Sequence, residues 1–350
     1  MKKNIRIIDI AKKAGVSIGT VDRVLHDRSE VSTETKDKIL KILKEFDYRP
    51  NILARTLASK KVIRFASLTP LFANKDSYWS KPQEGIEKAL EQIKQFGVSL
   101  SQFYYKLDDN NSFNEEAQKI LELSPDGVLL APSAKREALL FTQALVEKNI
   151  PYVFIDSTLK EATPLSFIVQ NSFQSGYLAA KMLDYGIKEQ STILLVHITR
   201  DLDNVNHLVL REKGFMNYFE FKKERGHQII KIEVVGDDNE LSEKLLEKGI
   251  ALTAIDAVFI TNSKVYQVVE CFQSLTKGPK IIGYDLIPGN IELLNAGKID
   301  FLICQKPEKQ GFVATNLLFD HIVKKEQVSP ENYTPIDIIT KENIEYYSSF

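Results

Sequence analysis

The chain has 350 residues, of which 43% are hydrophobic and 27% are charged, so it can bury one large core or several smaller ones. No apolar run approaches the roughly 20 residues that cross a membrane, and Lys2-Lys3 is not followed by the apolar stretch of a signal peptide. Cys271 and Cys304 lie far apart and form no CxxC pair, which argues against a disulfide framework. These features exclude a membrane-spanning chain and predict a soluble, cytoplasmic protein.

The net charge of −1 hides an asymmetry along the chain. Residues 1–61 hold 15 Lys and Arg against 8 Asp and Glu, whereas the remaining residues hold 31 against 39. A basic head on an acidic body is typical of a nucleic-acid-binding segment joined to a part that binds no nucleic acid.

The head begins with a pattern of two short helices separated by a tight turn. The apolar face of the first helix is formed by Ile7, Ile8, Ile10, Ala11 and Ala14. Gly15 tolerates the positive φ of a chain reversal, and Ser17 is a suitable N-cap for the second helix. In that helix Val21, Val24 and Leu25 face inward. The opposite, exposed face carries Ile18, Gly19, Asp22, Arg23 and His26. This pattern predicts a helix-turn-helix unit, whose second helix enters a DNA major groove.

A third helix and a short link complete the head. Ser32 can cap a helix that runs to Phe46, and Pro50 ends that segment. Residues 51–61 carry a narrow apolar stripe but are too short to form a stable helix alone. On pattern alone this segment is an ordinary linker.

The head closely resembles that of LacI-type transcriptional regulators, without a gap over about sixty residues. The matching stretches are Ile7 to Ser17, Thr20-Val21-x-Arg23-Val24-Leu25, Val31-Ser32-x-x-Thr35 and Tyr48-x-Pro50-Asn51-x-x-Ala54-x-x-Leu57. The resemblance implies DNA contacts from the second helix and its start, namely Ser17, Ile18, Gly19, Thr20, Asp22, Arg23 and His26. Asp22 stands where the family usually has Ser, and an acid facing a base can accept a hydrogen bond from a cytosine amino group. The family's usual operator sequence is therefore not assumed.

The resemblance also changes the interpretation of residues 51–61. In LacI-type regulators this segment becomes a hinge helix only on operator DNA, where a leucine from each subunit opens a base step in the minor groove. By residue match that leucine is Leu57, with Asn51, Ala54 and Arg55 beside it. The cost of unstacking is offset because a bent duplex meets more protein.

From Val62 onward, apolar runs of strand length alternate with amphipathic helical stretches. The predicted strands are 62–69, 98–105, 126–131, 151–156, 166–170, 192–198, 228–235, 256–261, 279–284 and 299–304. The predicted helices lie near 81–95, 113–122, 135–148, 173–185, 208–225, 239–249, 263–276 and 288–296. This alternation indicates parallel sheets, and ten strands suit two similar lobes better than one sheet.

This part resembles the sensor domain of LacI-type regulators and the ribose-type (type I) periplasmic sugar-binding proteins, more loosely than the head does. The anchoring stretches are Arg211-Glu212-Lys213-Gly214-Phe215, Ile282-Gly283-Tyr284-Asp285 and Gln305-Lys306-Pro307-x-x-Gln310-Gly311. The expected fold is an all-α helix-turn-helix head (1–50), a hinge (51–61) and an α/β two-lobed sensor domain with parallel sheets (62–350). By analogy the N-lobe comprises 62–156 and 306–334, and the C-lobe comprises 157–305 and 335–350. The chain would then cross between lobes near Asp156–Ser157, Gln305–Lys306 and Thr334.

A ligand cleft is expected beyond the carboxyl ends of the strands. The candidate contacts there are Phe72, Trp79, Ser133, Asp156, Asn171, Arg211, Asn262, Asp285 and Gln305. Amides, carboxylates, a guanidinium and an aromatic plate suit a polyhydroxylated ring. Three positions keep a structural alternative: Asp285 as a helix cap, Arg211 as the partner of an acid on the facing lobe, and Trp79 as core.

The remaining motifs do not support an enzyme. Gly15-Val16-Ser17-Ile18-Gly19 matches GxSxG, but a helix precedes it where a nucleophile elbow needs a strand. The five His show no metal-ligand spacing, there is no P-loop, and we expect no cofactor. We therefore expect a homodimeric regulator, a repressor in the sense usual for this family, that binds a near-palindromic double-stranded operator and a carbohydrate effector. Two alternatives stay open: a plain solute-binding protein, and an architectural DNA-binding protein whose body senses nothing.

Overall fold

The computed structural model describes residues 6–25, 31–46, 48, 62–199, 202, 205–235 and 240–347. The chain forms two compact units, Met1–Lys60 and Lys61–Phe350, which are described separately. The proposed hinge, residues 51–61, lies outside the described residues. Among the described residues no helix is long and apolar enough to cross a membrane.

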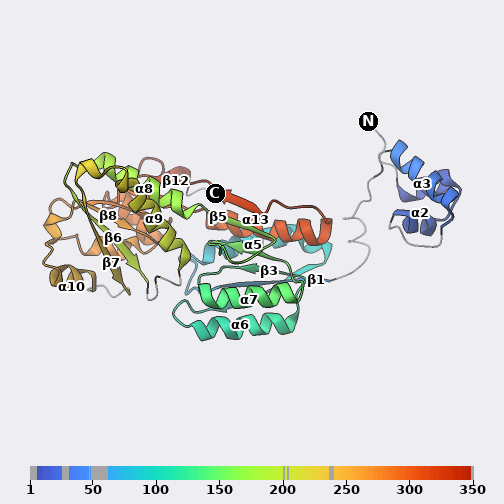
Figure 1. Ribbon diagram of the computed structural model, residues 1–350, viewed down its shortest axis with the longest axis horizontal. Helices are drawn as coiled ribbons and strands as arrows, with labels where there is room; N and C mark the ends of the chain where they lie inside the picture. Colours follow the sequence, from blue (N-terminus) through green and yellow to red (C-terminus); the bar gives the residue numbers. More distant parts are fainter. Residues whose placement is uncertain are drawn as a thin grey trace. The chain divides into compact units, whose positions relative to one another are not determined.

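The first unit is a small three-helix domain of α1 (Ile7–Ala14), α2 (Ile18–Leu25) and α3 (Thr33–Glu45) (Figure 1). Its core is made by Ile10, Ala11, Ala14, Val21, Val24, Ile39 and Leu43. Gly15 ends α1 with φ +70°, which permits the turn into α2. The Oγ atoms of Ser17 and Ser32 accept hydrogen bonds from the amides of Thr20 and Thr35, as N-caps do. The expectation that Ile8 faces inward is wrong, since it is 39% exposed.

The first lobe of the second unit is a fully parallel six-stranded sheet. Its strands, in spatial order, are β11 (Glu331–Thr334), β5 (Ser166–Gln170), β4 (Tyr152–Ile155), β3 (Gly127–Leu130), β1 (Ile63–Pro70) and β2 (Val98–Tyr105). Helices α6 (Asn110–Leu123) and α7 (Lys135–Glu147) cover one face, and α5 (Ser80–Ile93) and α13 (Pro307–Phe319) cover the other (Figure 1). Strands β3 and β4 are buried along their whole length, as both-face coverage requires.

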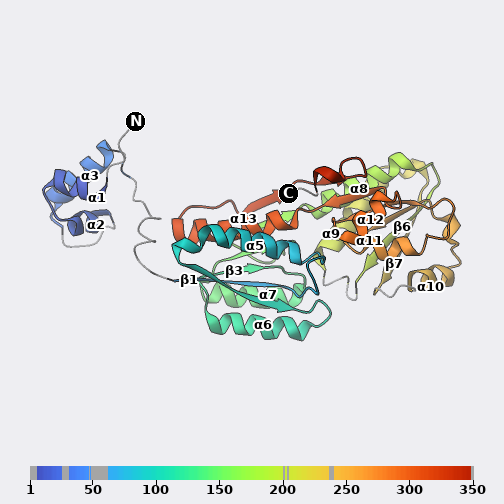
Figure 2. The same ribbon diagram turned by 180° about the vertical axis from the view of Figure 1, so that it is seen from behind.

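The second lobe repeats this architecture around a second six-stranded sheet. Its order is β12 (Asp337–Ile339), β10 (Phe301–Cys304), β9 (Lys280–Tyr284), β8 (Ala257–Ile260), β6 (Thr192–Ile198) and β7 (Gln228–Val234), with only β12 antiparallel. Helices α8 (Ser172–Gly186) and α9 (Asn206–Glu220) pack on one face. Helices α10 (Glu240–Glu247), α11 (Val265–Glu270) and α12 (Pro288–Asn295) pack on the other (Figure 2). The expected all-α head and two-lobed body with parallel sheets are confirmed.

Short helical turns fill several connections. They are η1 (Lys94–Phe96), η3 (Lys223–Arg225), η4 (Leu252–Ala254), η5 (Asp320–Lys324, a π-helix) and η6 (Ile344–Tyr346). The predicted helix at 263–276 is shorter than expected, because α11 ends at Glu270. The sequence did not predict α13, which packs against α5 and the first sheet.

The chain passes three times between the lobes. The expectation of a first crossing at Asp156–Ser157 is corrected, because β5 pairs in parallel with β4 and keeps the chain in the first lobe until Gln170. The second crossing runs from Cys304 in β10 to Pro307 in α13, and the third lies between β11 and β12.

Candidate ligand-binding cleft and nucleic-acid surface

A cavity of about 610 Å³ lies between the two lobes, at the carboxyl ends of their strands. We call it the interlobe cleft. The structure brings seven of the predicted ligand residues to its wall: Trp79, Ser133, Asp156, Arg211, Asn262, Asp285 and Gln305. Its volume falls within the range of small-molecule sites.

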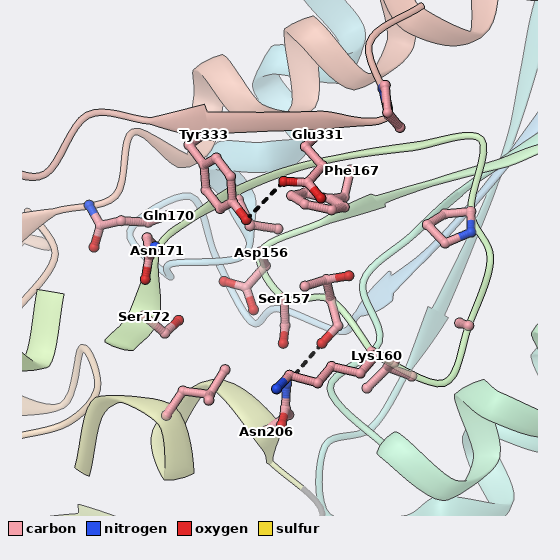
Figure 3. Close-up of a pocket in the computed structure, with 17 residues that line it drawn as sticks. Asp156, Ser157, Lys160, Phe167, Gln170, Asn171, Ser172, Asn206, Glu331 and Tyr333 are labelled. Atoms are coloured by element: carbon pink, nitrogen blue, oxygen red, sulfur yellow. Dashed lines mark hydrogen bonds between the residues drawn. The ribbon is translucent and has the colours of Figure 1, made fainter. Parts of the chain in front are cut away.

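Two predicted contacts do not line this cleft. The ring of Phe72 packs edge to face on Tyr104, with 5.6 Å between centroids. Asn171 caps α8, since its Oδ1 accepts from the Gln174 amide at 3.0 Å, and it lines a different cavity (Figure 3). The side chain of Phe72 is used in packing and that of Asn171 in capping, so neither contributes to the wall of the interlobe cleft.

Arg211 projects from α9 into the second lobe and is 1% exposed. Its terminal nitrogens donate to the carbonyl oxygen of Thr261 at 2.6 Å and to Oε1 of Gln305 at 2.5 Å. The guanidinium also lies over the ring of Tyr284, 3.7 Å from its centroid. Arg211 therefore makes no ion pair with an acid of the facing lobe among these contacts, because its partners are a carbonyl, an amide and a ring.

The close packing of α8 on α9 fixes the position of Arg211. A Cβ atom on Gly176 would lie 2.0 Å from the carbonyl oxygen of Arg211, and one on Gly214 would lie 1.9 Å from that of Phe173. The two helices therefore touch backbone to backbone at the residue that carries the guanidinium. Only glycine permits this approach.

Asp285 follows β9 in a left-handed conformation, with φ 70°. Its Oδ2 accepts from Nε2 of Gln305 at 2.8 Å, which links it to Arg211 through one amide. Its Oδ1 is buried and has no hydrogen-bond partner among the described residues. Burial raises the pKa of Asp285 to about 7, against the opposing effects of Arg211 and Gln305. Asp285 does not cap α12, whose N-cap residue is Ile287.

Asp156 occupies the equivalent position after β4 and is also left-handed, with φ 67°. Its backbone amide donates to Oε1 of Gln310 at 2.7 Å, and its Oδ1 accepts from the hydroxyl of Tyr78 at 2.6 Å. Its Oδ2 is buried without a hydrogen-bond partner in the described parts of the chain. Burial raises the pKa of this carboxyl as well.

Three further predicted residues complete the wall. The Oγ of Ser133 is buried and makes no hydrogen bond within the described structure. Asn262 donates to the carbonyl oxygen of Ile198 at 2.9 Å. Trp79 packs edge to face on Tyr78, with centroids 5.1 Å apart, and its side chain reaches the cavity.

Sequence reasoning missed several residues of the cleft, among them His207 and Tyr78. His207 lines it, with Nδ1 3.9 Å from Oδ2 of Asp156, and burial followed by the charge of Arg211 holds the pKa of His207 well below its usual value. Tyr78 lines it beside Trp79. The signals were present: His207 and Arg211 are spaced i, i+4 on one helix face, and Tyr78 adjoins an aromatic that was predicted.

The candidate nucleic-acid surface is the outer face of α2. Ile18 is 45% exposed, Gly19 and Arg23 are exposed, and Asp22 is half-buried. The hydroxyls of Ser17 and Thr20 are 2.9 Å apart at the start of the helix. The other predicted DNA contacts lie outside the described residues: His26, Asn51, Ala54, Arg55 and Leu57.

Comparisons with known proteins match both units. Residues 6–51 match the family of bacterial regulatory proteins of the lacI type, and residues 67–326 match the periplasmic binding protein domain. A putative LacI transcriptional regulator from Bacteroides fragilis has a similar structure, with 35% identity, 82% of this chain and all of that chain covered, and a TM-score of 0.75.

Two other relatives are similar to parts of the chain. Catabolite control protein A of Staphylococcus aureus (strain MRSA252) is 26% identical over 189 residues, or 53% of this chain, and the match spans about half of that relative's length (54%). GanP, a glucose-galactose binding protein from Geobacillus stearothermophilus, shares the fold at 21% identity, with a TM-score of 0.72 over 81% of this chain and 99% of its own. The chain belongs to the LacI family of bacterial regulatory proteins and carries a periplasmic-binding-protein domain.

Proposed function

We propose that this chain is a cytoplasmic transcriptional repressor that binds a near-palindromic operator as a homodimer. A sugar or sugar derivative in the interlobe cleft controls its affinity for that operator. The second helix of the head reads base edges, and the basic residues of the head supply salt-dependent attraction to phosphates. Residues 51–61 act as a hinge helix on DNA, with Leu57 in the minor groove.

The observation that carries the ligand proposal is a set of buried polar atoms without partners on the cleft wall. Oδ1 of Asp285 and Oγ of Ser133 lack hydrogen-bond partners within the described residues, as does Nε of Arg211. A buried polar group left unpaired costs about 1–3 kcal/mol, so a ligand that pairs with these atoms gains affinity. Hydroxyl groups suit them because each can donate and accept.

The charges on the wall favour a neutral ligand. Four carboxyl groups line the cavity, against two cations: Asp108, Asp109, Asp156 and Asp285, against Arg211 and Lys264. A phosphate or carboxylate would therefore meet more acids than cations, which disfavours a charged ligand. The ligand class is therefore a neutral sugar rather than a sugar phosphate or sugar acid. GanP, a glucose-galactose binding protein with the same fold, supports this choice.

Ligand binding and DNA binding are coupled by lobe closure. A ligand that contacts Asp156 of the first lobe and Asp285 of the second stabilises the closed arrangement. Closure changes the arrangement of the two lobes to which the hinge is joined in sequence and shifts the population competent for DNA. We propose that this shift releases the operator.

Two other classes make different predictions. A plain solute-binding protein has no DNA-binding head, whereas residues 6–51 match one. An architectural DNA-binding protein would bind DNA but show no response to any ligand. The reported relatives are named as regulators or binding proteins, and none of these names describes an enzyme.

A two-stage experiment tests the proposal. The full chain is first screened by thermal shift against neutral hexoses and pentoses and against their phosphates and uronic acids. A ligand at a hundred times its Kd adds about 2.7 kcal/mol to stability. The operator that the protein prefers is then selected from random DNA, and the affinity of the protein for it is measured by gel shift with and without the ligand. Stabilisation by phosphates alone would contradict the neutral class, and unchanged DNA affinity with a bound sugar would contradict the coupling.

A further inference from the structure

A second cavity, of about 460 Å³, lies beside the interlobe cleft (Figure 3). We call it the flank cavity. Its walls come from the segment after β4, from β5 and β11, and from the first turns of α8 and α9. It shares only Asp156 with the lining of the interlobe cleft.

A bridge between the lobes borders the flank cavity. Nδ2 of Asn206, the first residue of α9, donates to the carbonyl oxygen of Thr158 in the first lobe at 2.9 Å. Asn206 and Thr158 line the flank cavity and not the interlobe cleft. The flank cavity is therefore a separate compartment that opens on the same carboxylate.

The wall of the flank cavity presents both donors and acceptors. Figure 3 shows the carboxylate of Asp156 pointing into the space between Ser157, Asn171 and Ser172. Asp156 is 4% exposed and its Oδ2 has no hydrogen-bond partner in the described chain. Lys160 also lines the cavity and supplies an ammonium donor (Figure 3). Hydroxyl groups match such a mixed wall because they donate and accept.

An aromatic pair forms another wall. The rings of Phe167 and Tyr333 pack edge to face, with centroids 5.5 Å apart and planes at 72°. Tyr333 is 52% exposed, and its hydroxyl donates to Oε2 of Glu331 at 3.5 Å. An exposed aromatic ring near hydrogen-bonding groups suits the apolar face of a sugar or cyclitol.

Gln170, which lines the flank cavity, links the three lobe crossings by hydrogen bonds. Gln170 ends β5, and its Nε2 donates to the carbonyl oxygens of Cys304 at 3.0 Å and Pro335 at 3.1 Å. These carbonyls belong to the second and third crossings. A molecule held against β5 and the first turn of α8 would restrain the crossing that Gln170 clamps.

We propose that the flank cavity is a second small-molecule site, for a neutral polyol, and that its occupancy restrains the lobe crossings through Gln170. The site does not depend on the identity of the ligand in the interlobe cleft. The two sites are coupled because both present the carboxylate of Asp156.

The experiment uses a thiol reporter in the flank cavity and a fluorescent reporter in the interlobe cleft. Thr158→Cys places a half-buried thiol in the flank cavity alone. Cys271→Ser removes the half-buried native thiol, and Cys304 is slow to react because burial raises its pKa to about 12. Trp79, the one tryptophan of the sequence, reports on the interlobe cleft.

The full chain is modified with methyl methanethiosulfonate in the presence of D-glucose, D-arabinose or myo-inositol. At least one of these probes should slow modification at position 158 at least fivefold. Its half-effect concentration should differ from that of the Trp79 fluorescence change. Tyr333→Ala should raise the protecting concentration at least tenfold, whereas Tyr185→Ala, which removes another exposed tyrosine, should not change it.

Three results would overturn the proposal. The first is no protection by any of the three polyols. The second is protection that follows the Trp79 signal and survives Tyr333→Ala, which would reflect lobe closure alone. The third is protection by putrescine but by no polyol, which would replace the ligand class. Calorimetry on the unsubstituted chain measures the number of binding sites independently. A probe that both protects the thiol and alters Trp79 fluorescence should bind at two sites per chain. Binding at a single site would refute the second site.

Discussion

The buried carboxyl of Asp285 should make the stability of the chain depend on pH, and Asp285→Asn should remove that dependence. Burial raises the pKa of Asp285 from 3.8 to about 7 in the folded chain. This difference corresponds to about 4 kcal/mol between the protonated and ionised forms. Asparagine is neutral at every pH and can keep the hydrogen bond with Gln305 through its amide oxygen.

The sign follows from which state holds the proton more tightly. The folded chain keeps the proton of Asp285 to higher pH than the unfolded chain. The stabilising contribution is fully present below about pH 3.8 and is lost as the pH rises through about 7. The unsubstituted chain should therefore lose stability between pH 5 and pH 8.5, and the variant should lose about 2.7 kcal/mol less over this range.

Urea unfolding followed by circular dichroism at pH 5, 7 and 8.5 measures this difference. Asp76→Asn, the same substitution at an exposed position, is the matched control and should follow the unsubstituted chain. The ligand provides a second readout, because losing a charge-assisted hydrogen bond at Oδ1 should weaken sugar binding about 10- to 100-fold. Parallel stability curves for the unsubstituted chain and Asp285→Asn would refute the burial argument, whatever the ligand does.

Two other substitutions separate the body from the head. Gly176→Ala should lower the melting temperature and abolish ligand binding, because the new Cβ would lie 2.0 Å from the carbonyl oxygen of Arg211. Gly186→Ala in the same helix, with its Cβ 3.6 Å from the nearest neighbouring atom, is the control, and equal melting temperatures and sugar affinities would contradict the role of the close approach. Arg23→Ala should weaken operator binding about 10- to 100-fold in a gel-shift titration and leave sugar affinity unchanged. Lys38→Ala removes an exposed charge from α3 and should weaken operator binding less. If both variants lost the same operator affinity, Arg23 would contribute only general attraction to phosphates and would not read a base.

The strands and most helices could be predicted because their hydrophobic patterns are strong and local. Strands such as β3 read as uninterrupted apolar runs, and the structure buries them on both faces. Helix α13 was missed because its buried face does not read as an apolar stripe. Small or polar residues such as Gly311 and Thr315 are buried, whereas Phe312 and Val313 are only half-buried, so the pattern by which a surface helix is recognised is weak.

The lobe assignment of β5 could not be obtained from local pattern. Residues 166–170 form a strand wherever they lie, and only pairing with β4 and β11 places them in the first sheet. The candidate cleft was predictable where residues directly follow strands, as Asp156 and Asp285 do. Phe72 follows a strand too, but its ring is used in packing against Tyr104, which depends on the pairing of β1 with β2.

Gln170 shows how one side chain can contact all three crossings, and replacing its amide by a carboxyl group tests that role. Gln170 is 2% exposed, and its Nε2 is the donor to both Cys304 and Pro335. In Gln170→Glu at neutral pH a buried carboxylate would face two carbonyl oxygens, and both would lose their donor. Removing such donors from a buried site costs about 1–3 kcal/mol, and a buried charge adds to it.

Acidification distinguishes the loss of donors from the introduction of a charge. A protonated glutamic acid can donate to one of the two carbonyls, so Gln170→Glu should recover stability as the pH falls below its raised pKa. Gln170→Met keeps the volume without a donor or a charge, and its loss of stability should not vary with pH relative to the unsubstituted chain. Urea midpoints of the three chains at pH 4.5 and pH 8 provide the comparison. If neither variant is less stable than the unsubstituted chain at either pH, the amide of Gln170 does not clamp the crossings, and the link between the flank cavity and lobe closure fails with it.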